Sequence, residues 1–305
     1  MNYYVKGMTL AVIGSTLWGL SGVFAQMLFN NPVLSAEWLI SIRLFMGGLL
    51  ILTYALIKKE PIFAWMKNAQ DRRRLIIFAF FGMTAVQYTF FKAIQLTDAS
   101  TATILQFTAP IFIFLFLVLT RHKPFNLFEF FLIFLTLLGI GLIALGGKVE
   151  TISFSWSGFL VGMSSAIALA FYLLYPRQIM AKYGALIVAG WGMFLGGLAF
   201  QLLSPFWQPQ THLNTSELFN LLFVIVLGTA VPYIIFLSSL KYLPVTLASI
   251  LAALEPIVAT IFSAILFHRS FQPAEIMGML IVLTTITLLS ILDAKKVKVA
   301  HPVDK

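Results

Sequence analysis

Two charged side chains lie inside long apolar stretches of the chain. Glu255 stands near the middle of the segment 248–267, and Arg43 lies about a third of the way into the segment 35–57. A charged side chain at the centre of a bilayer costs ~2.5–3.5 kcal/mol on insertion scales, so it usually faces a cavity or a partner. Glu255 could bind a substrate ammonium group, carry a coupling proton, or fill a structural role beside carbonyls freed by Pro256. Arg43 could reach a substrate carboxylate, pair with Glu255, or extend its head to the interface.

Six aromatic side chains could line a cavity for an organic cation or an aromatic ring. The segment 157–177 places Tyr172 and Tyr175 close together on one helical face. Aromatic residues make up 15% of the chain, however, and most of them should pack against lipid or at the membrane interfaces. We therefore expect a minority of the six to face a substrate, and we favour Trp18, Tyr88 and Tyr172. The six residues are Trp18, Tyr88, Tyr172, Tyr175, Trp191 and Tyr233.

Amide and proline residues mark two further positions in the apolar stretches. Thr103, Gln106 and Pro110 share one helical face. An amide at membrane depth needs a hydrogen-bond partner on a neighbouring helix or a substrate, so Gln106 is a candidate lining residue and Gln87 poses the same question. Proline removes a backbone donor, so Pro110 and Pro256 should each interrupt a helix and free carbonyl groups for hydration or ligands.

The composition requires lipid as the solvent for most of this chain. Of its 305 residues 60% are hydrophobic and 10% charged, against roughly 45–50% and 25% in soluble domains. The net charge of +9 therefore serves membrane orientation rather than nucleic-acid binding. The sequence contains no cysteine and its four histidines are scattered, so we expect no metal site and no cofactor. It also lacks a P-loop, which argues against ATP-driven transport by this chain alone.

Long apolar segments predict an all-α integral membrane protein with ten transmembrane helices. Each segment holds roughly 20 residues, which is the length that crosses a bilayer as a helix. The connections between them are short, and no stretch has the composition of a soluble domain. The predicted spans are 7–29, 35–57, 75–93, 101–119, 127–146, 157–177, 185–204, 218–238, 248–267 and 273–292.

The distribution of basic residues predicts the orientation of these spans. With the N-terminus inside, most of the 20 Lys and Arg residues fall on the inner side, and only Lys92, Lys148 and Arg269 fall outside. Positive charge in short loops marks the cytoplasmic face. We therefore expect both termini to be cytoplasmic in a multi-pass protein of the cell membrane.

One stretch of the sequence occurs twice. Ala102–Glu129 aligns without a gap to Ala248–Glu275, with 9 of 28 positions identical, including a proline, a histidine and a glutamate. Five spans per copy is an odd number, so the second copy must enter the membrane from the opposite face. Inverted repeats are typical of secondary transporters, which bind substrate near the midplane between the halves. The predicted division is 1–147 and 148–293 for the two five-helix repeats, with a basic cytoplasmic tail at 294–305.

The chain resembles the EamA family of the drug/metabolite transporter superfamily over nearly its whole length. The residues that carry the likeness are Leu17-Trp18-Gly19, Ile42-Arg43-Leu44, the stretch Ala93–Pro110 and Leu254-Glu255-Pro256. The resemblance implies two five-helix repeats and movement of small organic metabolites, commonly amino acids, across a bacterial cell membrane. One departure is that Arg121-His122-Lys123 and Phe267-His268-Arg269 stand where the family often has a Gly-Glu-Arg-like turn, which leaves the role of His122 and His268 open.

These observations favour a secondary transporter of an amino acid, amine or related solute, working by alternating access. A proton or another ion is the expected coupling partner, and the oligomeric state is not predicted. One alternative is a flippase for a lipid-linked intermediate, which would need a groove open to lipid. Another is a membrane-embedded enzyme, but its candidate acid–base pairs, His122/Glu129 and His268/Glu275, fall on opposite sides of the membrane.

Overall fold

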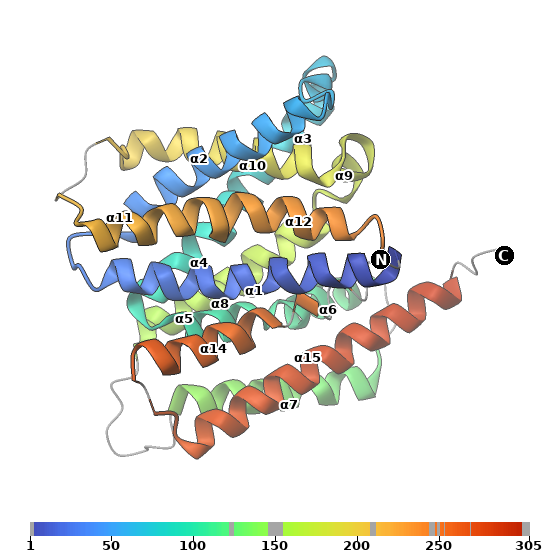
Figure 1. Cartoon of the computed structure of the whole chain (residues 1–305). Helices are drawn as coiled ribbons and strands as arrows, with labels where there is room; N and C mark the ends of the chain where they lie inside the picture. Colours follow the sequence, from blue (N-terminus) through green and yellow to red (C-terminus); the bar gives the residue numbers. More distant parts are fainter. Residues whose placement is uncertain are drawn as a thin grey trace.

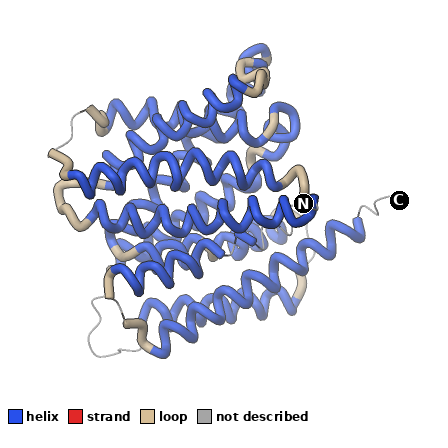
Figure 2. Tube along the Cα trace, viewed as in Figure 1, coloured by secondary structure: helices blue, strands red, loops and turns tan. Residues whose placement is uncertain are grey.

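The computed structural model is a bundle of helices, and no strand occurs in the part of the chain that it describes (Figures 1 and 2). It describes residues 3–121, 125–145, 155–207, 212–243, 248, 251–252, 254–268 and 270–300. Seven helical stretches are long and apolar enough to cross a membrane. Three shorter apolar helices, Leu127–Leu142, Leu254–Leu266 and Pro273–Thr285, lie in three further segments that the sequence predicted as spans. The all-helical membrane fold is therefore confirmed.

The helices follow one another with short connections. In the first half of the chain they are α1 (Tyr3–Phe29), α2 (Ala36–Ile57), the short 3-10 helix η1 (Ala64–Lys67), α3 (Ala69–Ile77), η2 (Phe78–Thr84), α4 (Ala85–Leu96), α5 (Ala99–Gln106), α6 (Ala109–Leu119) and α7 (Leu127–Leu145). In the second half they are α8 (Trp156–Leu174), α9 (Arg177–Tyr183), α10 (Ala185–Leu203), α11 (Thr215–Leu222), η3 (Phe223–Ala230), α12 (Val231–Ser239), α14 (Leu254–Leu266) and α15 (Pro273–Ala300).

Two of the long spans contain a π-helical segment. α3, η2 and α4 form one continuous span, and α11, η3 and α12 form another. A π-helical turn widens the helix and leaves carbonyl groups without their usual partner, and such turns often occur at functional sites. In η3 the Thr229 hydroxyl donates to the Val224 carbonyl at 2.7 Å. A side-chain hydroxyl thus satisfies a backbone acceptor of the widened turn.

A third span is broken rather than widened. α5 ends at Gln106 and α6 begins at Ala109, so the helix is interrupted at Phe107 and Thr108, and Pro110 lies in the first turn of α6. The Thr108 hydroxyl donates to the Leu105 carbonyl at 2.7 Å and satisfies one acceptor at the break. Pro256 is buried in α14. Pro110 thus lies at the start of a helical segment.

Glycines allow α2 and α10 to pack backbone against backbone. A Cβ atom at Gly48 would lie 2.4 Å from the Phe194 nitrogen, and one at Gly197 would lie 2.2 Å from the Phe45 nitrogen. Real Cβ atoms do not approach other atoms so closely, so only glycine fits. Small residues at such contacts are the usual means of helix packing in membranes, where no hydrophobic effect draws helices together.

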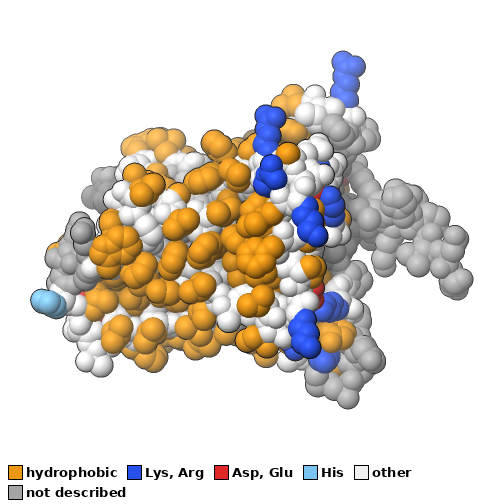
Figure 3. All heavy atoms as spheres, turned by 90° about the horizontal axis from the view of Figure 1, so that it is seen from above, with side chains coloured by type: hydrophobic (Ala, Val, Ile, Leu, Met, Phe, Trp, Pro, Cys, Tyr) orange, Lys and Arg blue, Asp and Glu red, His pale blue; other side chains and the backbone are white. Residues whose placement is uncertain are grey.

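The surface separates apolar and basic residues. Large apolar side chains such as Leu119, Leu202 and Leu203 are 77–88% exposed, which suits contact with lipid chains. Lys and Arg side chains gather at one end of the bundle, the end at which both chain termini lie (Figures 1 and 3). We call this the basic end and the other the opposite end.

Candidate substrate site

Arg43 is a buried charged residue with several hydrogen-bond partners in the bundle interior. Its side chain is 3% exposed, and its guanidinium donates to Thr229 Oγ1 at 2.6 Å, to the Gly228 carbonyl at 3.2 Å, and to Gln87 Oε1. The ring of Phe91 lies 4.2 Å below the guanidinium carbon. The widened helix η3 supplies two of these acceptors. The head therefore stays inside the bundle rather than extending to the interface.

Gln87 extends this network to an aromatic group. Its amide nitrogen donates to the Tyr233 hydroxyl at 3.1 Å. The indole of Trp18 meets the Tyr233 ring edge-on with 5.1 Å between centroids, and it packs on Phe236 at 4.8 Å. The Tyr172 and Tyr233 hydroxyls lie close enough to interact. Trp18, Tyr172 and Tyr233, which come from α1, α8 and α12, thus form one group that we call the aromatic cluster.

Glu255 lies beside the aromatic cluster without a direct partner. Its carboxylate interacts through space with the Arg43 guanidinium and the Tyr233 hydroxyl, but it makes no hydrogen bond or ion pair with any residue that the structure describes. Its side chain is only partly buried. A Cβ at Gly19 would lie 2.6 Å from the Glu255 carbonyl, so α1 and α14 touch there. An ionised carboxylate at this depth is costly unless something neutralises it.

Gln106 has a protein partner in the other half of the chain. Its amide nitrogen donates to Ser165 Oγ on α8 at 2.8 Å, and both side chains are buried. Ser100 on α5 forms a comparable hydroxyl contact with Thr260 on α14 at 2.7 Å. Thr103 donates to the Ala99 carbonyl at 2.6 Å. The polar groups of α5 therefore hold it to α8 and α14.

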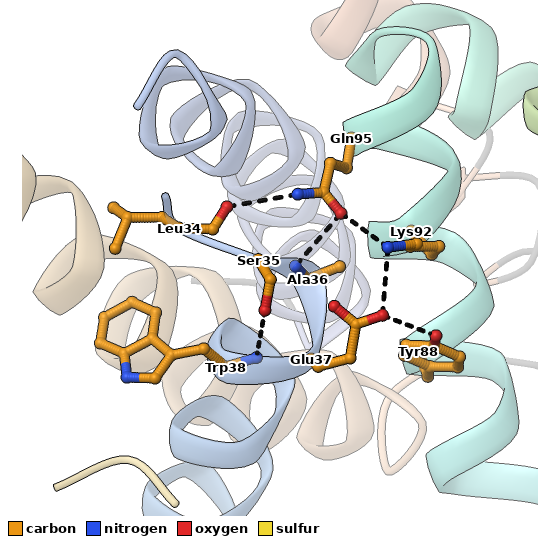
Figure 4. A network of polar contacts seen from close by, with 8 residues as sticks. All are labelled: Leu34, Ser35, Ala36, Glu37, Trp38, Tyr88, Lys92 and Gln95. Atoms are coloured by element: carbon orange, nitrogen blue, oxygen red, sulfur yellow. Dashed lines mark hydrogen bonds and ion pairs between the residues drawn. The ribbon is translucent and has the colours of Figure 1, made fainter. Parts of the chain in front are cut away.

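Tyr88 belongs to a second network, around the start of α2 (Figure 4). Its hydroxyl donates to Glu37 Oε1 at 2.8 Å, and Lys92 forms an ion pair with the same oxygen at 3.1 Å. Lys92 also donates to Gln95, whose amide in turn binds the Leu34 carbonyl. We call this the Glu37 network. It fastens the start of α2 to the end of α4, and it places Tyr88 apart from the aromatic cluster.

Two more of the predicted aromatic residues also lie outside the cluster. Trp191 donates its indole N–H to the Ile62 carbonyl at 2.7 Å and packs against Trp65 with 5.2 Å between ring centroids. It therefore anchors the connection that follows α2. Tyr175 is the residue that caps the end of α8, and its ring stacks on the ring of Phe171 with 4.7 Å between centroids. The structure thus brings together Trp18, Tyr172, Tyr233 and Glu255. Thr229 was not predicted as a partner of Arg43, because no local pattern distinguishes it from other threonines in apolar segments.

Helices long and apolar enough to cross a membrane, with buried polar side chains such as Arg43 between them, define an integral membrane protein. The model of the EamA-like transporter family matches residues 5–145 and again residues 156–291, and the chain belongs to this family. The predicted family is therefore confirmed. The transporter class also agrees with the expectation that the chain is not an enzyme.

Curated relatives and a solved structure agree with this assignment. The chain is 33% identical over 298 residues to the uncharacterized inner membrane transporter YicL of Salmonella typhimurium, covering 97% of this chain and 98% of the relative. It is 24% identical over 257 residues to the threonine/homoserine exporter RhtA of Escherichia coli, covering 84% and 81%. A crystal structure with 15% identity superposes with a TM-score of 0.63 over 97% of this chain and 99% of the other, which shows a shared fold.

Proposed function

We propose that the protein is a secondary transporter of a small organic metabolite that carries an ammonium group. The observation that carries this proposal is the Glu255 carboxylate, which has no direct protein partner among the described residues and lies beside the aromatic cluster. A carboxylate supplies the opposite charge for an ammonium group, and aromatic faces add cation–π attraction. Each guanidinium nitrogen of Arg43 donates to a protein group, namely Thr229, Gly228 or Gln87, so we assign Arg43 the role of holding helices together.

Amino acids and amines are the substrate classes that fit this site. RhtA, one of the relatives, is named a threonine/homoserine exporter, and both of those compounds carry an α-ammonium group. A carboxylate without a fixed protein partner can also exchange a proton, as acidic residues of membrane pumps do. We therefore propose the proton as the coupling ion.

Alternating access between two inverted five-helix halves, 1–147 and 148–293, is the proposed mechanism. Its support is that contacts between the halves come in matched pairs: α2 packs on η3 as α10 packs on η2, and α1 packs on α12 as α8 packs on α4. The π-helical segments begin at Phe78 and Phe223, which is almost the offset of the sequence repeat. α1 begins at the basic end, whereas α8, its counterpart in the second half, ends there and is followed by α9 (Figure 1). We assign the basic end to the cytoplasm.

Transport into proteoliposomes tests the proposal. The purified protein would be reconstituted and offered threonine, homoserine, aromatic amino acids and choline-like amines, with and without a pH gradient. The expected result is uptake or counterflow of at least one ammonium compound, accelerated by the gradient. Failure to move any member of the panel, together with normal movement of an anionic or uncharged solute, would contradict the assignment of Glu255 as the binding carboxylate.

A further inference from the structure

A short motif occurs at the start of two spans, one at each end of the bundle. Asn68-Ala69-Gln70-Asp71 begins α3, and Asn214-Thr215-Ser216-Glu217 begins α11. In each, the asparagine caps the helix by accepting a hydrogen bond from the backbone nitrogen of the acidic residue, at 3.2 Å for Asp71 and 2.9 Å for Glu217. The two motifs are separated by the same offset as the sequence repeat. They are therefore equivalent positions of the two halves.

Each acidic residue also reaches across to the other half of the chain. At the basic end, Asp71 Oδ2 accepts from Lys182 Nζ at 2.5 Å and from the Tyr183 hydroxyl at 2.7 Å. At the opposite end, Glu217 Oε1 accepts from Asn31 Nδ2 at 2.8 Å. Asn31 lies in the connection between α1 and α2, and Lys182 in the connection between α8 and α10. The partner thus comes in both cases from the link between the first two spans of the other half.

The two contacts differ in strength because only one of them contains an ion pair. Asp71 is 7% exposed in its side chain and takes two donors, the Tyr183 hydroxyl and the charged Lys182, whose side chain is 53% exposed and therefore partly screened. The hydrogen bond to Asp71 raises the pKa of Lys182 above its ordinary value, so the pair stays ionised at physiological pH. Glu217 takes one neutral amide donor from the other half, while its second oxygen accepts from its own cap, Asn214 N, at 2.8 Å. Charge-assisted hydrogen bonds are roughly twice as strong as neutral ones.

We infer that these two contacts are the ties that hold the two ends of the bundle closed, and that the weaker one sets the end that opens first. We call them the Asp71 tie and the Glu217 tie. The inference rests on the proposed alternating access, in which one end must separate while the other stays shut. Because the Asp71 tie is the stronger, the substrate-free protein opens more readily at the Glu217 tie, which lies at the end assigned to the outside.

Distance measurements between spin labels test the ties without any need for transport. The chain has no cysteine, so pairs of cysteines can be introduced at exposed positions on either side of each tie. Arg72 and Arg177 flank the Asp71 tie, and Val33 and Leu218 flank the Glu217 tie. In the otherwise unchanged protein in liposomes, the Val33–Leu218 pair should show the larger fraction of long distances.

Variants of the ties should shift these distances in opposite directions at the two ends. Asp71→Asn should raise the ratio of long to short distances at the Arg72–Arg177 pair roughly three- to tenfold and lower it at the other pair. Asn31→Ala should do the reverse. The reciprocal change is the informative readout, since a merely local loosening would leave the far end unaffected. Lys182→Met provides a second variant that leaves the cap of α3 intact.

Removal of the caps gives the matched controls. Asn68→Ala and Asn214→Ala weaken the helix starts but leave the cross-half partners of Asp71 and Glu217 in place. Unchanged far-end distances in Asp71→Asn and Lys182→Met, or an equal effect of Asn68→Ala, would overturn the inference. If the wild type transports no solute but the variants show the reciprocal shifts in distance, the proposed function is contradicted and the ties are supported.

Discussion

The α2–η3 and α10–η2 interfaces are built alike, yet only one of them contains a charge. In both, the first glycine of a Gly-Gly pair faces a threonine of a π-helical segment. A Cβ at Gly47 would lie 2.8 Å from Thr229 Cγ2, and one at Gly196 would lie 1.9 Å from Thr84 Oγ1. Four residues before the glycine pair stands Arg43 in α2, but Gly192 stands at that place in α10.

The hydroxyls of the two threonines therefore have different partners. Thr229 accepts a hydrogen bond from Arg43, whereas the buried Thr84 hydroxyl has no partner in the part of the chain that the structure describes. Close packing of a glycine pair on a π-helical segment thus does not depend on the arginine. The Arg43 network is an addition to one interface, and it links that interface through Gln87 to the aromatic cluster.

Among changes at these interfaces, substitution of Arg43 should lower the free energy of unfolding the most. Arg43→Met leaves Thr229, Gln87 and the Gly228 carbonyl without their donor in a buried region, and each such group costs about 1–3 kcal/mol. We expect a loss of about 3–5 kcal/mol in the free energy of unfolding, measured by reversible denaturation in mixed micelles. Gly192→Ala, at the equivalent place in α10, serves as the comparison, because a Cβ there meets Phe78 at 3.0 Å and removes no hydrogen bond. A smaller loss for Arg43→Met than for Gly192→Ala would contradict this account.

The glycine contact between α2 and α10 should be nearly as sensitive. Gly197→Val places a side chain against the Phe45 backbone, and overpacking of this kind typically costs about 1–3 kcal/mol. Gly141→Val is the control, since a Cβ there would meet nothing within 4 Å. The thermal midpoint of Gly197→Val should fall clearly below that of Gly141→Val. Equal midpoints would show that α2 and α10 are not in backbone contact.

The same substitution at Thr229 and at Thr84 compares the two interfaces directly. Thr229→Val removes an acceptor of the Arg43 guanidinium and should destabilise the protein by about 1.5–3 kcal/mol. Thr84→Val replaces an unpaired buried hydroxyl with a methyl group of similar shape and should be neutral or slightly stabilising. Chemical denaturation of both variants beside the wild type measures the difference. Equal effects in the two variants would remove the asymmetry between the interfaces.

The Glu37 network should make the smallest contribution. The side chains of Glu37 and Lys92 are 32% and 28% exposed, so their ion pair is partly screened by solvent. Glu37→Gln keeps an acceptor for Tyr88 and should cost less than about 1 kcal/mol in stability. A loss of stability close to that of Arg43→Met, measured in the same denaturation assay, would contradict the small contribution that we assign to this network.

The membrane fold and the mid-span charges could be predicted from the sequence because they depend on local properties. Apolar length marks the helices, and Arg43 and Glu255 are conspicuous against an apolar background. The partners of those charges could not be predicted. Thr229 and Gln87 lie 186 and 44 positions from Arg43 in the chain, and only the packing of helices brings them together.

The aromatic residues illustrate the same limit. From the sequence we favour Trp18, Tyr88 and Tyr172 over Trp191, yet all four lie in apolar segments and only Trp18 and Tyr172 belong to the aromatic cluster. Tyr88 faces Glu37 and Trp191 faces the Ile62 carbonyl because of where neighbouring helices end, which no local pattern encodes. We did not predict the repeated Asn-x-x-acid motif as a pair of helix caps, and its cross-half partners required the structure.

The affinity of the Glu255→Gln variant for a transported ammonium compound is the most direct test of the central claim. Binding would be measured by isothermal titration in parallel with the wild type, with Glu60→Gln as a control because Glu60 is exposed. The account predicts that Glu255→Gln binds about tenfold to a hundredfold more weakly and that Glu60→Gln binds normally. Unchanged affinity in Glu255→Gln would contradict it.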